Sequence, residues 1–408
     1  MAQFTIKRLG HQGNGIADDT TGQIFVPFSL PGEVIEGELD GKRILSPKII
    51  TPSSDRVRPS CSHFKACGGC ALQHGSDDFL ARWKVETVKS ALAAQGIEAP
   101  FHEIITSPAA SRRRATLAGT RTKKGAIVGF HGRASNTVID IPNCTLLHPE
   151  IVKGLSVLKA LTILGASRKN LISLRITQSD VGLDISVMDA KKTDGALLAH
   201  LGQLVERHNL ARLSWNGEVI ATRVAPVQKF QDIAVIPPSG AFLQATVAGQ
   251  NALIASVGKA VGKAARIVDL FAGCGTFTLP LAHQSEILAV EAEQSALASL
   301  DAAWRKTPGL KTVTTEARDL FRRPLLADEL AKFQAAIIDP PRAGAKAQVE
   351  VLAQSEIAKI AFVSCNPVTF ARDAATLIAA GYLLDWVQVI DQFHWSPHVE
   401  LVASFHRP

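Results

Sequence analysis

The sequence predicts a mixed α/β protein whose C-terminal part contains a parallel, doubly wound sheet. After Pro237-Pro238, short apolar segments alternate with helical stretches, as expected for strands joined by crossover helices. The chain has 408 residues, which allows two or three domains of ~150 residues each. Its composition, 46% hydrophobic and 20% charged, is that of a folded protein with substantial cores. The four expected strands are 266–271, 287–290, 335–338 and 358–363.

The composition and the start of the chain limit where the protein works and what it binds. No apolar run reaches the ~18 residues of a membrane span, and residues 1–8 lack the apolar core of a signal peptide. We therefore expect a cytoplasmic protein whose cysteines stay reduced unless they bind metal or take part in chemistry. The 44 Lys and Arg residues exceed the 37 Asp and Glu residues, and the net charge of +7 permits a polyanionic partner. No protein partner is indicated, so we expect a monomer.

Residues 1–55 read as a small β-barrel. The segments 10–17, 23–28 and 32–39 alternate apolar and polar residues and are separated by Gly, Pro and Asp turns. Short strands joined in this way are typical of a barrel of the OB type. A stretch rich in Pro, Ser and Arg then leads into the next part of the chain.

Residues 56–235 have an α+β pattern, and residues 236–408 form the doubly wound part. A cluster of cysteines opens the central part, and an amphipathic helix with apolar residues from Phe79 to Ala93 follows it. The expected central strands are 113–121, 125–130, 174–177 and 183–188, and the expected helices are 149–163 and 194–208.

The run 267–278 is an apolar strand, a glycine turn and a helix start. Gly273 and Gly275 let a ligand approach the backbone closely, and Thr276 is a candidate cap for the helix. Glu291 ends the next strand, where a carboxylate can accept hydrogen bonds from both hydroxyls of a ribose. The third glycine of the dinucleotide fingerprint is missing, which disfavours NAD.

The sequence Asp269-Leu-Phe-Ala-Gly-Cys-Gly-Thr-Phe277 resembles the first motif of class I S-adenosylmethionine (SAM) methyltransferases. This resemblance implies a Rossmann-like domain with SAM as cofactor, and Glu291 stands in the usual acidic position. In that family an acidic residue on the third strand completes the pocket, and Asp319 fits this role. A solvent-exposed Asp at a helix start is the structural alternative for Asp319.

Two further motifs carry residues suited to chemistry on a pyrimidine. Asp339-Pro-Pro-Arg342 follows the fourth strand and forms a rigid loop at the crevice of the sheet. Cys365 lies in Ser-Cys-Asn-Pro after the next strand, where a turn lets its side chain reach a ligand. Methylation of uracil at C5 needs a thiolate that adds to C6 and a base that removes the C5 proton. Glu400, in His-Val-Glu near the C-terminus, is the candidate base, although a Glu among apolar residues also fits an outward-facing strand position.

The motifs D-P-P-R, S-C-N-P and H-V-E together resemble those of the RNA 5-methyluridine methyltransferases, the TrmA/RumA group. The resemblance covers nearly the whole chain and implies that Cys365 is the nucleophile, Glu400 the base, and Asp339 a residue between SAM and the target base. The family's F-x-Q element appears as Phe242-Leu243-Gln244, whose Gln contacts SAM in that family. Two further SAM-contacting positions of the family fall on Phe271 and Thr276.

Two positions depart from the frequent family pattern. Thr246 stands where the family often has Asn, and Thr276 also replaces a frequent Asn. Both changes keep a polar side chain, so they affect contact details and leave the predicted cofactor unchanged.

Four cysteines outside the catalytic domain form a second signal. Cys61, Cys67 and Cys70 have the spacing C-x5-C-x2-C, and Cys144 lies further along. Four thiolates can hold zinc or a [4Fe–4S] cluster, and structural zinc sites usually use two C-x2-C pairs, of which this chain has one. The spacing resembles the RumA branch, where these residues bind [4Fe–4S], and this resemblance favours the cluster. In that branch the helical segment after the cysteines packs on the catalytic domain, so the resemblance implies that 72–106 packs on the C-terminal domain despite its position in the chain.

The resemblance also implies RNA as the partner. The N-terminal barrel resembles a TRAM domain, an OB-like RNA-binding module, and its basic candidates are Lys7, Arg8, Lys42 and Arg43. The run 112–114 resembles an R-R-R-A strand of the family. Alternation along a strand places Arg112 and Arg114 on one face and Arg113 on the other.

TRAM and the cysteine set together indicate the 23S rRNA branch. A tRNA m5U methyltransferase is the near alternative. A non-catalytic RNA-binding iron–sulfur protein on the same fold is the alternative of another class.

Overall fold

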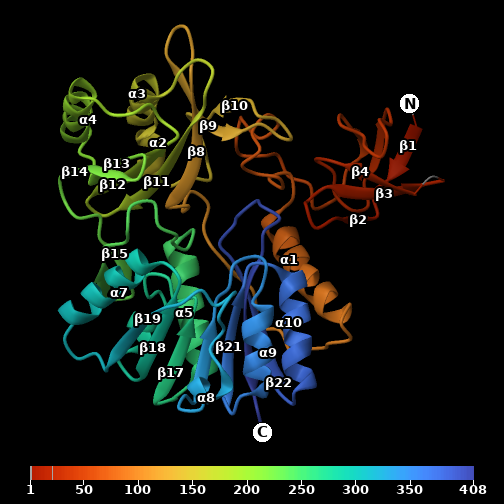
Figure 1. Cartoon of the computed structure of the whole chain (residues 1–408). Coiled ribbons are helices and arrows are strands. Elements are labelled where there is room, and N and C mark those ends of the chain that lie inside the picture. Colours follow the sequence, from red (N-terminus) through yellow and green to blue (C-terminus); the bar gives the residue numbers. More distant parts are fainter. Residues whose placement is uncertain (1, 21) are drawn as a thin grey trace.

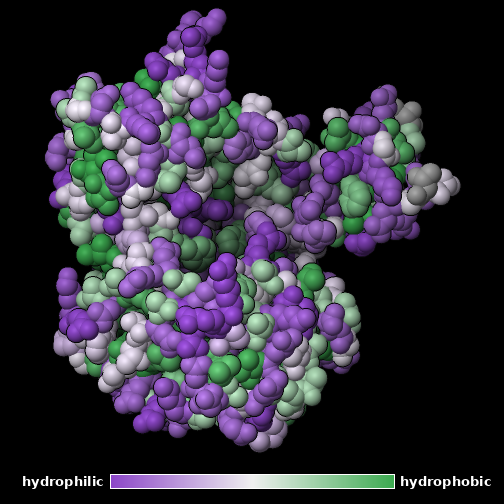
Figure 2. Space-filling view, in the orientation of Figure 1, coloured by the Kyte–Doolittle hydropathy of each residue, from purple (hydrophilic) through white to green (hydrophobic). Residues whose placement is uncertain are grey.

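The computed structural model describes residues 2–20 and 22–408, and it has a mixed α/β architecture. Figure 1 shows three parts: an N-terminal part set to one side, a central part, and a C-terminal part below both. The space-filling view is hollowed between the central and C-terminal parts (Figure 2). None of the helices in the described ranges has the length and apolar character that a membrane span requires.

The N-terminal part consists of two small antiparallel sheets around one core. Side chains of both sheets and of the connecting loops meet in this core, among them Ile6, Ile24 and Ile35. One sheet has the order β1 (Ala2–Thr5), β5 (Val34–Gly37), β6 (Lys48–Thr51), and the other has β2 (Arg8–Leu9), β3 (Gly15–Asp19), β4 (Gly22–Val26). The segment 10–14 is a turn between β2 and β3, closed by bonds from the Gly10 amide to the Asn14 carbonyl and from the Gly13 amide to the Gly10 carbonyl. The first expected strand, 10–17, therefore begins only at Gly15.

The central part has one large sheet with helices packed against it. The strands are β8 (Arg114–Arg121), β9 (Ala126–His131), β10 (Val138–Asp140), β11 (Ile172–Ser179), β12 (Gly182–Met188), β13 (Arg212–Trp215) and β14 (Glu218–Thr222). Their order is β10-β9-β8-β11-β12-β13-β14, antiparallel except between β12 and β13. The helices are α2 (Pro149–Lys153), α3 (Leu155–Gly165) and α4 (Gly195–Arg207), and a separate hairpin is formed by β15 (Gln228–Phe230) and β16 (Ile233–Val235).

The C-terminal sheet is parallel over five strands, as the sequence predicts. These are β17 (Arg266–Leu270), β18 (Glu286–Glu291), β19 (Val313–Ala317), β20 (Ala335–Ile338) and β21 (Lys359–Ser364). The sheet order is β19-β18-β17-β20-β21-β23-β22-β7, and β23 (Glu400–His406) is antiparallel to both of its neighbours, β21 and β22 (Leu383–Asp391). The helices are α5 (Val247–Val261), α6 (Thr278–Leu281), α7 (Gln294–Lys306), α8 (Ala327–Leu330), α9 (Lys346–Gln354) and α10 (Pro367–Ala379).

The segment after the cysteine cluster lies against the C-terminal sheet. Strand β7 (Ile105–Thr106) pairs in parallel with the end of β22. Helix α1 (Asp77–Ala93) runs beside α10 (Figure 1), and its buried Val88 and Leu92 belong to the apolar core of that sheet. Lys84 of α1 is fully buried and forms an ion pair of 2.5 Å with Asp391 at the end of β22. Helix α1 is thus held to the catalytic half of the chain by apolar packing and by one buried charge pair.

Candidate active site

The C-terminal ends of the parallel strands bring the predicted reactive residues to one edge of the sheet. Asp339 directly follows β20, and Cys365 directly follows β21. Strand β23 is antiparallel to β21, and the pairing of Ser364 with Leu401 places Glu400 beside Cys365. Glu400 is buried, not outward-facing, because β23 lies between β21 and β22 inside the sheet. The edge therefore holds a thiol and two carboxyl groups from three different segments.

The electrostatics of this edge favour neutral side chains. Burial, followed by the charge of Glu400, raises the pKa of the Asp339 carboxyl well above its usual range. Burial also raises the pKa of Glu400 to about 7, although a hydrogen bond from Gln392 and the charge of Arg114 lower it. Burial and the charges of Glu400 and Asp339 raise the pKa of the Cys365 thiol to about 11. Close carboxyl groups in a low-dielectric site cannot both ionise easily, so this cluster holds at least one proton near neutral pH.

The turn that carries Cys365 is fixed by its neighbours. Asn366 caps helix α10, with its side-chain oxygen accepting a bond from the Val368 amide at 3.1 Å. The Asn366 amide nitrogen donates to the Arg342 carbonyl at 2.9 Å, which connects this turn to the Asp-Pro-Pro-Arg loop. Pro367 begins the helix, where its missing N–H costs nothing. Cys365 therefore lies in a rigid turn beside Arg342, whose charge lowers the pKa of the thiol.

The glycine turn after β17 has the backbone geometry that a ligand-binding loop needs. Gly273 and Gly275 have φ values of 54° and 89°, a conformation that other residues rarely adopt. A side chain at Gly273 would meet no atom within 4 Å, so this face of the turn is open. Glu291 ends β18, and its Oε2 accepts a bond from the Gly273 amide at 3.1 Å. The predicted ribose-binding carboxylate and the glycine turn are therefore in contact.

The other predicted cofactor residues surround this turn. Phe271 has a positive φ of 65°, and its ring lies 5.5 Å from that of Phe321, which the sequence analysis did not single out. Phe321 is half exposed and available to stack on a ligand. Asp319 accepts a bond from the Phe321 amide at 3.0 Å and pairs with Arg322 at 3.4 Å. Gln244 is buried beside Gln392, which joins it to the Glu400 carboxylate.

The prediction that Thr276 caps the following helix is wrong. Helix α6 begins at Thr278, and its N-cap residue is Phe277 without a side-chain cap. The Thr278 hydroxyl instead donates a bond of 2.5 Å to Asp269, a fully buried carboxyl on β17. Burial raises the pKa of Asp269 to about 7, and its second oxygen has no protein partner. Asp269 was part of the glycine motif but was not predicted as a site residue, because its burial depends on the fold.

The four cysteines of the second motif meet where the three parts of the chain join. Cys70 belongs to a small core that includes Leu9 of the N-terminal part and Trp395 of the C-terminal part. Cys61 and Cys144 pack against this core, and Cys67 lies in the adjacent core of the central part. Burial and, to a smaller extent, the charges of the other three cysteines together raise the pKa of Cys70 to about 12. All four are free thiols. In the described part of the chain, no group of three or more His, Cys, Asp or Glu side chains is arranged to hold a metal ion.

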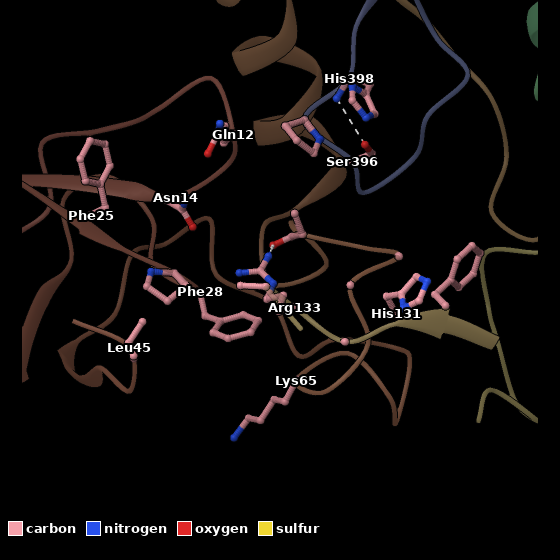
Figure 3. A pocket seen from close by; sticks show the side chains of 18 of the residues that line it. Gln12, Asn14, Phe25, Phe28, Leu45, Lys65, His131, Arg133, Ser396 and His398 are labelled. Carbon is pink, nitrogen blue, oxygen red and sulfur yellow. Dashed lines mark hydrogen bonds between the residues drawn. The ribbon is translucent and has the colours of Figure 1, made fainter. Parts of the chain in front are cut away.

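A groove of about 860 Å³ lies at the same junction. Its walls come from the N-terminal part, the cysteine segment, the central part and the loop before Glu400. Figure 3 shows Phe28, Arg133 and His398 around it, with the Arg133 guanidinium 4.3 Å from the centre of the Phe28 ring. Arg43 and Lys65 add positive charge, and no Asp or Glu occurs among the described residues that line the groove. Basic and aromatic side chains without acidic ones are suited to a nucleic-acid strand.

The three arginines of the run 112–114 have different surroundings. Arg113 is buried and donates to the side chains of Gln228 and Gln250 and to the Gln244 carbonyl, so it supports the F-x-Q segment. The Arg114 guanidinium lies 4.2 Å above the exposed Phe242 ring and near Glu400. Arg112 lines the groove.

The four basic candidates of the N-terminal part do not act together. Arg43 lines the groove, whereas Lys7 forms an ion pair with Asp18 at 3.1 Å. Neither Arg8 nor Lys42 lines the groove.

Comparison with known proteins identifies the family. The family model described as tRNA (uracil-5-)-methyltransferase matches residues 202–407. An RNA methyltransferase of Mesorhizobium japonicum is 42% identical over 407 residues, covering 100% of this chain and 98% of that protein. The 23S rRNA (uracil(1939)-C(5))-methyltransferase RlmD of a Shewanella species is 30% identical over 430 residues, covering 98% and 95%.

A solved structure has the same fold over the whole chain. The tRNA (uracil-54, C5)-methyltransferase of Pyrococcus abyssi, in complex with S-adenosyl-L-homocysteine, has a TM-score of 0.77 and 23% sequence identity, and the match covers 99% of both chains. Together with the residues gathered at the sheet edge, these relationships show that the chain is an RNA (uracil-5-)-methyltransferase and belongs to the tRNA (uracil-5-)-methyltransferase family.

Proposed function

We propose that the protein methylates C5 of a uridine in 23S rRNA through a covalent bond between Cys365 and C6 of the base. The observation that carries this proposal is the placement of Cys365 and Glu400 side by side at the end of β21. A protein that only binds RNA needs neither a thiol nor a buried base at such an edge. The intact pair therefore favours catalysis over the alternative of a non-catalytic RNA-binding protein.

The residues support the following sequence of steps. The Cys365 sulfur attacks C6 as its thiol proton passes to solvent, and the electron pair of the C5–C6 double bond moves into an enolate that makes C5 nucleophilic. SAM supplies the methyl group that C5 accepts. Glu400 then removes the C5 proton, the double bond forms again, and the Cys365 thiolate is expelled. Glu400 is suited to this task because its pKa of about 7 lets it accept a proton and lose it again near neutral pH.

We assign the SAM site to the open glycine turn and its surroundings. The left-handed backbone of Gly273 and Gly275 and the nearby Glu291 carboxylate fit a nucleoside with a ribose. We place the remaining contacts at Gln244, Phe271, Thr276, Asp319 and Asp339. Asp339 lies between this pocket and Cys365, and it is kept neutral by burial beside Glu400, so it can donate a hydrogen bond.

We also propose that Cys61, Cys67, Cys70 and Cys144 hold a [4Fe–4S] cluster. In such a cluster each thiolate binds a different iron atom, so the four sulfur atoms stand further apart than around a single zinc ion. The proposal rests on four free thiols at one junction, with Cys61, Cys70 and Cys144 at one apolar core and Cys67 in the adjacent core. The Gly69 amide points at the Cys67 sulfur at 3.4 Å, a contact that also stabilises a thiolate. Visible absorbance in anaerobically purified protein distinguishes the cluster from colourless zinc.

We propose three domains, with residues 1–55 as an RNA-binding barrel of the TRAM and OB type, 56–235 as the cluster-bearing domain and 236–408 as the methyltransferase domain. The choice of rRNA is supported by the 30% identical relative, whose name gives 23S rRNA as its substrate. The structural neighbour is named for tRNA, so tRNA is the second candidate substrate.

The test is a methyl-transfer assay with anaerobically purified protein. Methyl-labelled SAM is offered with unmodified 23S rRNA or tRNA, and labelled nucleosides are identified after digestion. We expect 5-methyluridine in rRNA, abolished in Cys365→Ala. Retained SAM binding by Cys365→Ala is the control, since it shows that the substitution leaves the cofactor site intact. Label in tRNA alone would change the substrate, and label in neither RNA would favour the binding-protein alternative.

A further inference from the structure

Gln392, which directly follows β22, makes three hydrogen bonds through its buried side-chain amide. Its Oε1 accepts a bond of 2.7 Å from the Ala245 backbone amide. Its Nε2 donates to Glu400 Oε2 at 2.6 Å and to the side-chain oxygen of Gln244. Only 2% of the Gln392 surface is exposed. One side chain therefore connects the predicted base with a predicted cofactor-binding residue.

The chemistry of these partners allows only one orientation of the Gln392 amide. A backbone N–H can only donate, so the oxygen of the amide must face Ala245. The nitrogen then faces Glu400 and Gln244, and both of its hydrogens are used. Because the amide nitrogen cannot accept a proton, its bond to Glu400 is strongest when that carboxyl is ionised. The bond from Gln392 Nε2 to Gln244 fixes the side-chain oxygen of Gln244. The Gln244 amide nitrogen therefore faces away from Gln392.

Helix α5 is shaped to accept Gln392. Gly249 lies in the first turn of this helix, and a Cβ atom built there would be 2.6 Å from Cβ of Gln392. Real Cβ atoms do not approach so closely, so any larger residue at this position would displace Gln392. The Gly249 amide donates to the Thr246 hydroxyl, so Gly249 does not use it to contact Glu400.

We propose that Gln392 is a positioning residue for the methyl-transfer reaction: it holds Glu400 as a proton-accepting carboxylate and orients Gln244 beside it. This inference rests on the proposed function, in which Glu400 removes the C5 proton. Neither the sequence motifs nor the predicted roles include Gln392, because its function follows only from the contacts across three segments.

The charged groups around Glu400 determine what loss of this contact does. Asp339 faces it from the end of β20 and Cys365 from the end of β21, while Arg114 faces it from β8. Burial raises the Glu400 pKa, and Gln392 and Arg114 oppose this. Gln392→Leu removes one of the two contributions that lower the Glu400 pKa. The pKa therefore rises, and a higher pH is needed to ionise Glu400.

The experiment compares two substrates so that proton removal is isolated. With uridine-containing RNA the full reaction occurs, including loss of the C5 proton. With 5-fluorouridine, thiol addition and methyl transfer occur, but C5 carries no proton to remove, so the covalent adduct with Cys365 persists. The rate of turnover divided by the rate of adduct formation, measured across pH, reports the step that Glu400 performs.

For Gln392→Leu we expect turnover to fall more than adduct formation, because loss of the Gln244 contact affects both, whereas loss of the Glu400 contact affects turnover alone. The turnover ratio should fall by about tenfold near pH 6, and its acidic limb should move up by about one pH unit. Gly249→Ala should give the same shift, because it displaces Gln392 without replacing it. Gln388→Leu is the matched control: this glutamine of β22 is also buried, but its amide bonds to backbone carbonyls outside the site.

Each outcome decides between the proposals. An unshifted acidic limb in Gln392→Leu, with adduct and turnover falling together, would mean that Gln392 is only structural and would overturn the inference. The same shift in Gln388→Leu would also overturn it, since any lost buried glutamine would then suffice. Absence of the adduct in the unsubstituted enzyme would instead reject the covalent mechanism of the proposed function. Thermal unfolding of each variant shows whether it is folded.

Discussion

The Cys365 thiol lies in surroundings that oppose its ionisation. Two buried carboxyl groups and the loss of water raise its pKa to about 11, whereas only Arg342 and a backbone hydrogen bond lower it. A nucleophilic cysteine is usually activated by the opposite kind of surroundings. The free enzyme therefore keeps Cys365 as a thiol near neutral pH, which limits its reaction with other electrophiles.

A substitution at Glu400 tests this electrostatic coupling without any RNA. Glu400→Gln keeps an oxygen that can accept the Gln392 bond but removes a negative charge near the thiol. We expect the pKa of Cys365 to fall. Because each unit of pKa changes the thiolate fraction by about tenfold, alkylation by iodoacetamide at pH 8 should become several-fold faster. The measurement is mass spectrometry of the Cys365 peptide.

Cys274 is the internal reference for that measurement. Its thiol is also buried, and the charges that raise its pKa come from Glu293 and Glu291 and not from Glu400. The Cys274 peptide should therefore react equally in both proteins. If Cys365 were alkylated at the same rate in Glu400→Gln, the two groups would not be coupled.

Among the secondary-structure elements, helix α1 packs on a part of the molecule that is far from it in the chain. It follows the cysteine segment in the chain, yet it packs against α10 and supports the loop that leads to Glu400. Lys84 donates to Asp391 and to the Phe393 carbonyl, and the Ala71 and Leu72 amides donate to the Trp395 carbonyl. The loop between β22 and β23 is thus held from two sides by residues of the first hundred.

Removal of the Lys84 charge tests how much this support contributes. Lys84→Met leaves Asp391 buried and without its cationic partner, which typically costs on the order of 3–5 kcal/mol in unfolding free energy. We expect a large loss of stability in urea unfolding and reduced methyl transfer, since the loop before Glu400 loses an anchor.

A control on the same helix separates the buried pair from charge loss in general. Arg82 pairs with Asp55 at 3.1 Å on the surface, so Arg82→Ala should cost about 1 kcal/mol or less. The double variant Lys84→Met/Asp391→Leu should recover part of the lost stability, because no unpaired charge remains. Equal stability of Lys84→Met and Arg82→Ala would show that the pair contributes little.

At the scale of the whole molecule, the groove at the junction of the three parts is a basic surface without acidic side chains among its described lining residues. Arg43, Lys65 and Arg133 line this groove, which Figure 3 shows beside the loop that carries His398. Phosphate groups bound there would release counterions, so binding should depend strongly on salt.

Salt dependence of RNA binding tests this location. Replacement of Arg43, Lys65 or Arg133 by Gln should weaken binding of a 23S rRNA fragment and reduce the slope of log Kd against log salt by about 1 for each lost phosphate contact. Arg305→Gln is the control, since Arg305 pairs with Asp301 on the surface of α7. Unchanged slopes in the groove variants would place the RNA elsewhere on the molecule.

The order of chemistry-bearing residues could be predicted from the sequence because a parallel sheet gathers its strand ends. Each of Gly273, Glu291, Asp339 and Cys365 follows or ends an apolar strand, and the β-α alternation brings those ends to one edge. The four parallel strands named in advance appear as β17, β18, β20 and β21. Periodicity and residue type were sufficient for these features, since both are local properties of the chain.

Other features depend on contacts between segments that are far apart in the chain. Gln392 acquires its role only because β22, α5 and the F-x-Q segment meet around it, and Asp269 only because β17 is buried. The pKa values of Glu400 and Cys365, the position of α1 and the groove likewise follow from burial and from register across strands. The sequence by itself therefore determined the parallel sheet, the family resemblance and the order of the candidate reactive residues, because these follow from local motifs. Only the tertiary structure decided the protonation of these residues and the contacts that hold them in place, because both depend on which distant groups share a low-dielectric site.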